Sequence, residues 1–203
     1  MGYETKEAEA KRREIHTLIA ASLQESGIAD ANRVTDEAIA QFASITAPYW
    51  EAPPLQYLTL KSGGMGGGAT TKPGNVLLNL GKLVRAIATG ALTIAGAMAA
   101  PWTLVIGALV TWDSLYSCLK LNISEEHACV IWALWKVRDE RDSVAKSDVL
   151  EAVNQEREQF GKQPLSPQEV QRALDDLLKM RCLQPSKNDP DRLRLRECVT
   201  VKY

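Results

Sequence analysis

Residues 86–112, AIATGALTIAGAMAAPWTLVIGALVTW, contain no charged side chain, and this stretch decides what kind of fold the chain can adopt. As one helix rising about 1.5 Å per residue it would span roughly 40 Å, more than the hydrocarbon core of about 30 Å. Pro101 and many small residues interrupt the run, and a straight helix would have to kink at the proline. The stretch therefore either meets lipid or forms the buried centre of a helical assembly.

Pro101 favours a hairpin over a single span. Proline is best tolerated at the first position of a helix, so Ala100-Pro101-Trp102 predicts a turn between two helices, at about 76–99 and 101–120. The uncharged part of each helix is too short to cross a bilayer. The hairpin is therefore expected either to insert shallowly into a membrane or to be buried in the chain or in an oligomer. Its large apolar side chains are the candidates for membrane or oligomer contact: Ile94, Met98, Trp102, Leu104, Ile106, Leu109 and Trp112.

The composition argues against catalysis and against general attraction to nucleic acid. Twenty-four basic and 25 acidic residues give a net charge of -1. The four cysteines lack metal-ligand spacing, the only histidines are His16 and His127, and common catalytic motifs are missing from the sequence. The expectation is a non-enzymatic protein with no catalytic residues, metal, cofactor or small-molecule substrate. The cysteines and the lack of a secretory signal predict a cytoplasmic protein, with peripheral or monotopic attachment to the inner face of a membrane as the alternative.

The first part of the chain predicts helices followed by a connector. Residues 4–46 have helical apolar spacing with a break near Gly27 and Asp30, and Thr35 is a candidate N-cap. Prolines and aromatic residues follow, and then a glycine-rich stretch without the strand–helix frame of a phosphate-binding loop. Four regions result: 1–62, a helical N-terminal region with the connector; 63–75, a flexible glycine-rich linker; 76–121, the hairpin; and 122–203, a C-terminal domain.

The C-terminal region has clear signals for three helices and a strand. Ser124 is a candidate N-cap for a helix that is apolar nearly all round, and a second helix is expected at about 146–159. Ser166-Pro167-Gln168-Glu169 combines a serine cap, a proline at the first helical position and a glutamate at the third. The alternation in RLRLRECVTVKY, residues 192–203, predicts a strand.

Residues 124–203 resemble a winged helix-turn-helix domain. The segment SPQEVQRALDDLLKMRCLQP is similar to its third helix, and DRLRLRECVTVKY is similar to the return strand of its wing. The complete fold is therefore expected to be mostly α, with N-terminal helices, a central apolar helical hairpin and a C-terminal winged helix with a small β-hairpin. The resemblance covers only this region, and many unrelated functions use the fold.

The resemblance implies a candidate contact surface for nucleic acid or for a protein partner. The third helix would supply Gln168, Gln171, Arg172 and Lys179, and the wing would supply Lys187, Arg192, Arg194 and Arg196. Asp175 and Asp176 lie on the exposed side of the same helix, where they would repel phosphate. A dedicated DNA reader is usually basic, and this region is not. The balance favours a protein partner over DNA.

Three functions stay open from the sequence. The first is a non-enzymatic effector or accessory protein whose hairpin mediates self-association or shallow membrane insertion, with the winged helix as a protein-interaction or regulatory module. The second is a DNA-binding transcription regulator in which the hairpin is a dimerisation core. The third is a soluble helical scaffold or adaptor subunit in which the hairpin is simply core.

Overall fold

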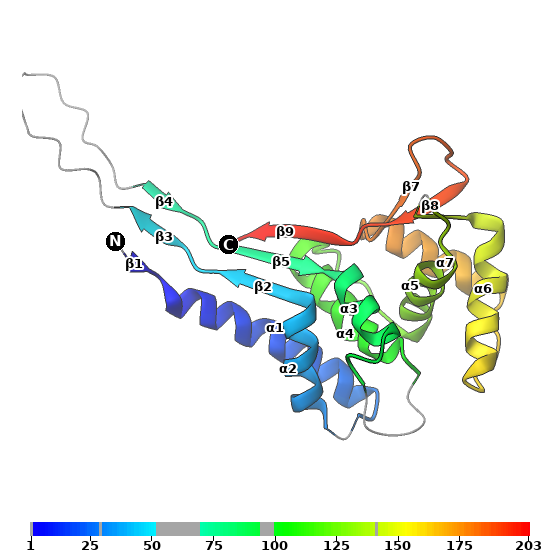
Figure 1. The fold of residues 1–203 in the computed structure, drawn as a ribbon, viewed down its shortest axis with the longest axis horizontal. Helices are drawn as coiled ribbons and strands as arrows, with labels where there is room; N and C mark the ends of the chain where they lie inside the picture. Colours follow the sequence, from blue (N-terminus) through cyan, green and yellow to red (C-terminus); the bar gives the residue numbers. More distant parts are fainter. Residues whose placement is uncertain (1, 29, 52–69, 94–99, 141) are drawn as a thin grey trace, which may run out of the picture.

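A computed structural model describes residues 2–28, 30–51, 70–93, 100–140 and 142–203, and the chain is mostly helical with small antiparallel sheets (Figure 1). The described helices are α1 (Thr5–Glu25), α2 (Ala31–Phe42), α3 (Leu80–Ala88), α4 (Thr103–Trp112), α5 (Glu125–Val137), α6 (Lys146–Gln159) and α7 (Pro167–Lys179), with a π-helical turn η1 (Asp113–Ser117) after α4. The described strands are β1 (Gly2–Tyr3), β2 (Ala43–Thr46), β3 (Tyr49–Glu51), β4 (Thr70–Lys72), β5 (Asn75–Asn79), β6 (Ser143–Ala145), β7 (Leu183–Pro185), β8 (Arg192–Leu195) and β9 (Cys198–Lys202).

The strands form three antiparallel sheets. The central sheet has the order β2-β5-β9, and α1 and α2 pack beside it. The sheet β1-β3-β4 continues it away from the helical body (Figure 1). The sheet β6-β8-β7 lies at the other end, beside α5, α6 and α7.

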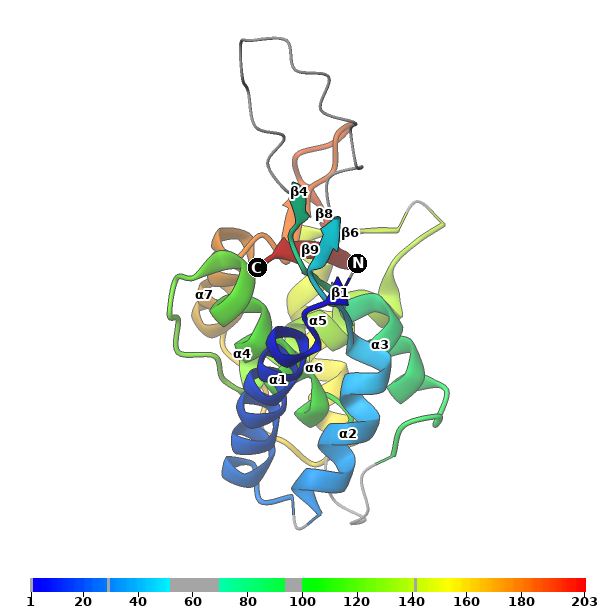
Figure 2. The ribbon, with the colours of Figure 1, turned by 90° about the vertical axis from the view of Figure 1, so that its left-hand side faces the viewer.

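The second half of the uncharged run is the central helix of the molecule. α4 lies between α1, α3 and α5 (Figure 2). Trp102 and Trp112 are fully buried, and both belong to an apolar core that is continuous from α1 to β9. Gly107 allows α4 to approach α1 closely, because a Cβ at this position would lie 3.1 Å from Ile19 Cγ2 and 3.2 Å from Ile19 Cα. Within the run, α4 is therefore largely covered by other parts of the same chain.

The expected helical hairpin differs from the structure on both sides of Pro101. Residues 75–79 are a strand of the central sheet, and the helix that follows ends at Ala88. Residues 94–99 lie outside the described residues. On the other side, the helical backbone ends at Ser117, and Cys118 follows in the left-handed region with a φ of 55°. Within the described ranges, no helix has the length and apolar character needed to cross a bilayer.

The N-terminal helices are confirmed, but their ends differ from the prediction. α2 begins after Asp30 rather than at Thr35, whose side chain is fully buried. The helical spacing was expected to reach residue 46, yet residues 43–46 form β2 and pair with β5. The partner strand decides this, since Ala43 lies opposite Leu78 and Ile45 opposite Val76.

The glycine-rich region does not separate the N-terminal helices from the rest of the chain. β2 and β5 pair directly, and beyond them Glu51 pairs with Thr70 in the β3–β4 ladder. Residues 51 and 70, which flank an undescribed segment, are therefore neighbours in the β3–β4 ladder. A flexible linker was predicted for residues 63–75, but residues 70–72 form β4 and residue 75 begins β5. Residues 63–69 lie outside the described part.

The C-terminal helices agree well with their sequence signals. α6 has the expected bounds, and α7 begins with the expected capping box, in which Ser166 Oγ accepts from the Glu169 amide at 3.3 Å. The expected single strand at residues 192–203 is instead two strands in different sheets. β8 pairs with β6 and β7, whereas β9 pairs with β5 of the central sheet.

The cysteines offer a direct test of this packing. Cys118 and Cys198 are exposed, whereas Cys129 and Cys182 are buried. Burial raises the pKa of the Cys129 thiol to about 12 and raises the pKa of Cys182 well above its usual range, so neither forms thiolate readily. At about pH 8 an aromatic disulfide reagent should modify Cys118 and Cys198 rapidly, and the buried pair only after unfolding. A Cys118→Ser, Cys198→Ser variant should lose the rapid phase; rapid modification of this variant would contradict the fold.

Candidate functional site

The outward side of α7 is an exposed polar surface, which we call the α7 face. It consists of Gln168, Gln171, Arg172, Asp175 and Lys179, all of them exposed. With Pro167 and Asp176 these side chains line an open depression of about 540 Å³. The opposite side of the helix packs into the core through Val170, Ala173, Leu174 and Leu177, at helical spacing.

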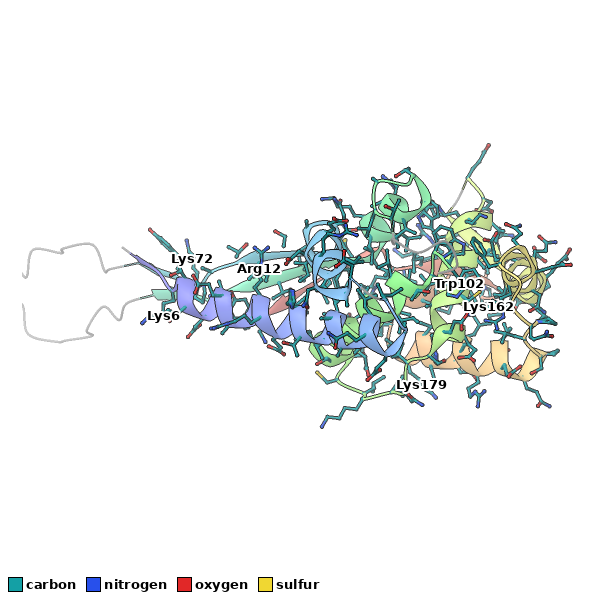
Figure 3. All side chains as sticks on the ribbon, turned by 90° about the horizontal axis from the view of Figure 1, so that it is seen from below. Lys6, Arg12, Lys72, Trp102, Lys162 and Lys179 are labelled. Atoms are coloured by element: carbon teal, nitrogen blue, oxygen red, sulfur yellow. The ribbon has the colours of Figure 1, made fainter. Side chains whose placement is uncertain are left out.

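Two hydrogen bonds link side chains on this helix, and one of them joins opposite charges. Gln171 Nε2 donates to Asp175 Oδ1 at 2.8 Å, and Lys179 Nζ donates to Asp176 Oδ1 at 2.9 Å. The hydrogen bond from Lys179 lowers the pKa of Asp176, and the same bond raises the pKa of Lys179. The α7 face therefore carries both signs of charge, and the side chain of Lys179 lies at the surface of the helix (Figure 3).

Two of the predicted wing arginines are used inside the molecule. Arg192 donates to Ser143 Oγ at 2.9 Å and forms an ion pair with Asp139. Arg196 donates to Tyr116 Oη at 2.7 Å. These contacts tie the sheet β6-β8-β7 to the loop after α5 and to η1, and they occupy the guanidinium groups that phosphate binding would require.

The other two predicted wing residues have different surroundings. Lys187 is exposed in the loop between β7 and β8. Arg194 is half-buried and lines a small pocket of about 210 Å³ with Arg138 and Glu197, which themselves form an ion pair at 2.9 Å. The structure thus gathers the predicted α7 residues on one surface, whereas acidic side chains lie beside the predicted arginines, Asp139 at Arg192 and Glu197 at Arg194.

The predicted membrane or oligomer contacts lie mainly inside the fold. Trp102, Leu104, Leu109 and Trp112 are at most 1% exposed, and Ile106 is partly buried against the core. Ile94 and Met98 lie outside the described residues. The buried side chains contact α1, α5 and neighbouring elements of the same chain, so in this fold they are not accessible to lipid or to another subunit.

Sequence reasoning missed a polar cluster that joins α5 to α7. His127 Nδ1 accepts from the Ser124 amide at 3.2 Å and lies 2.8 Å from Ser124 Oγ, which completes a capping box at the start of α5. His127 Nε2 lies 3.5 Å from Asp176 Oδ2. Because a backbone amide can only donate, the neutral ring carries its proton on Nε2, facing Asp176. Serine followed three positions later by histidine is the signal that could have predicted this cap.

A second missed cluster joins the uncharged run to the C-terminal helices. Trp102 Nε1 donates to Glu125 Oε1 at 3.1 Å, and Arg157 and Lys162 lie 3.6 and 3.3 Å from the same oxygen. The Phe160 ring packs edge-on against Trp102, with ring centroids 5.2 Å apart. Figure 3 shows Trp102 and Lys162 side by side at this contact. The start of α4 is thereby fixed to α5 and to the end of α6.

The described side chains show no arrangement suited to metal chemistry. Over residues 2–28, 30–51, 70–93, 100–140 and 142–203, no group of three or more histidine, cysteine, aspartate or glutamate side chains could hold a metal ion. Searches against protein families, curated proteins and solved structures find no match to this chain.

Proposed function

We propose that this chain is a non-enzymatic adaptor whose C-terminal region is a winged-helix module that binds a protein partner through the α7 face. The element order α5-β6-α6-α7-β7-β8, with β8 between β6 and β7, supports the winged-helix assignment. The N-terminal half packs against this module, since α4 contacts α5 and β9 pairs with β5 of the central sheet.

The observation that carries the proposal is the exposed α7 face with its mixed charges. Phosphate contacts dominate nucleic-acid affinity and require available cations. Here Lys179 is paired with Asp176, Asp175 lies on the same face, and Arg192 and Arg196 are engaged inside the fold. Exposed polar groups of both signs, with Arg172 among them, suit the surface of a protein interface.

The burial of Trp102 and of α4, in the second half of the uncharged run, supports an adaptor over an effector that inserts into a membrane. Trp102 and Trp112 are fully buried and each donates a hydrogen bond to another part of the chain, to Glu125 and to the Met180 carbonyl. Exposing these side chains would break both the core and the contacts to the C-terminal helices.

Site-specific crosslinking tests the α7 face. A photoreactive amino acid in place of Gln171, in the full chain and in its native cells, should give a discrete crosslinked protein. The same amino acid in place of Gln159, exposed on α6, should not give it. Adding Arg172→Glu to the Gln171 probe should reduce the adduct at least about tenfold, because reversing an interface charge places like charges together. Identical adducts from both positions, or none from Gln171, would count against the proposal.

DNA binding is the competing outcome and has its own test. Fluorescence anisotropy with labelled duplex DNA should show no salt-dependent binding by the full chain. Lys187→Glu and Arg194→Glu are the informative variants, because Arg192 and Arg196 also hold the fold together. Tight binding that both variants weaken would favour a DNA-binding regulator instead.

A further inference from the structure

We infer that the outer edge of β2 is a self-association surface, at which two copies of the chain pair their β2 strands antiparallel about a two-fold axis. The central sheet has the order β2-β5-β9, so β2 is an edge strand. Within the described residues, one side of β2 pairs with β5 and the other side pairs with no strand. An edge strand with open backbone groups is a template for pairing with another chain.

The backbone of β2 shows which groups are open. The Ala43 amide donates to the Ile39 carbonyl at the end of α2 rather than to β5. Hydrogen-bonded and non-hydrogen-bonded pairs alternate in an antiparallel ladder, so the amide and carbonyl of Ile45 also face away from β5. Beyond β2 this edge is covered, because β1 pairs with β3 and the Glu4 amide donates to the Pro48 carbonyl. The open part of the edge is therefore confined to β2.

An apolar groove runs beside this open edge. It lies between the first half of α1, the end of α2 and β2, and has a volume of about 470 Å³. Its apolar lining is made of small or branched side chains that allow a second backbone to approach: Ala8, Ile39, Ala40, Ala43 and Ile45. Glu9 and Arg12 of α1 line the same groove and are exposed (Figure 3 labels Arg12).

The two charges indicate a second copy as the occupant. In the described part of the chain, neither Glu9 nor Arg12 forms an ion pair. They lie about one turn apart on α1. A two-fold axis brings residue i against residue j and residue j against residue i, so Glu9 of each copy can face Arg12 of the other. The Glu9 and Arg12 side chains of one copy are therefore complementary in charge to the same two side chains of a second copy.

The other edge of the central sheet lacks these features. β9 exposes Thr200 and Lys202 along its length, and a lysine on an edge strand opposes pairing with another sheet. β2, with the sequence Ala-Ser-Ile-Thr, carries no charge. The open edge, the apolar groove and the self-complementary charges coincide only at β2 among the described strands of this sheet.

Sedimentation of the full chain over a range of concentrations tests the inference. The wild type should show a monomer–dimer equilibrium. Glu9→Arg and Arg12→Glu should each weaken the dimer at least about tenfold, because each variant places like charges across the axis. An equimolar mixture of the two variants should dimerise again, since one then supplies two arginines and the other two glutamates.

The controls separate a specific interface from misfolding or general charge effects. Arg13→Glu changes a neighbouring exposed arginine that does not line the groove, and it should leave the dimer unchanged. Circular dichroism should show the same helical content in every variant. A wild type that remains monomeric would overturn the inference. The groove would then be more suited to an extended segment of another protein. A dimer that neither charge reversal weakens would also overturn it.

Discussion

Replacing Trp112 with alanine should lower the free energy of unfolding by about 4 kcal/mol, the usual range for a buried tryptophan. The side chain is fully buried, and its Nε1 donates to the Met180 carbonyl at 3.2 Å. Its ring also packs edge-on against Tyr116, with centroids 5.6 Å apart. The change would leave a large cavity where α4 meets the end of α7, so the N-terminal half and the C-terminal helices should lose stability together.

Urea denaturation followed by circular dichroism measures this effect. Trp112→Phe should cost about 2 kcal/mol, because it keeps most of the ring packing but leaves the Met180 carbonyl without its donor. Phe160→Leu is the control, since Phe160 is 43% exposed and should cost under about 1 kcal/mol. A loss below about 1 kcal/mol for Trp112→Ala would contradict the burial of this side chain. Separate unfolding of the C-terminal helices would contradict the continuous core.

Asp113→Ala should lower the free energy of unfolding by about 3 kcal/mol, because it removes the shared acceptor of three partly buried hydrogen bonds. Asp113 is only 3% exposed, although it carries a carboxylate. Its Oδ1 accepts from Ser117 Oγ at 2.6 Å and from the Leu119 amide at 3.0 Å, and its Oδ2 accepts from the Leu121 amide at 2.7 Å. This one side chain therefore orders the turn that leads from α4 towards α5.

Hydrogen exchange gives a local readout for this prediction. In Asp113→Ala the amides of Leu119 and Leu121 should lose protection more than the amides of α5 do. Asp113→Asn should have a smaller effect, since the amide retains one acceptor oxygen. Ser114→Ala, at the exposed neighbouring position, should change neither stability nor exchange appreciably. Unchanged exchange at both leucine amides in Asp113→Ala would show that the carboxylate does not hold the turn.

Elements set by local signals could be predicted from the sequence. The bounds of α6 and the capping box of α7 depend on residues within a few positions of each other, and both agree with the structure. The apolar character of α5 agrees with the burial of its residues from His127 to Leu134. The exposed α7 face also follows from helical spacing alone.

Elements set by distant partners could not be predicted in this way. β5 has the sequence Asn-Val-Leu-Leu-Asn, which suits a helix as well as a strand, and its pairing with β2 and β9 decides between them. The contacts of the wing arginines could not be predicted for the same reason. Arg196 donates a hydrogen bond to Tyr116, which is far away in the sequence, and no local pattern indicates that contact.

The pairing of β9 with β5 imposes an order on how the chain can be made. Residues 80–197 separate these two strands, so a ribosome must synthesise everything between them before the central sheet can close. Until residue 202 has left the exit tunnel, β5 has β2 on one side and an unpaired edge on the other. Nascent chains of this protein should therefore depend most on chaperones before β9 emerges, and a premature stop after residue 197 would release a chain with all of its described helices but an unfinished sheet.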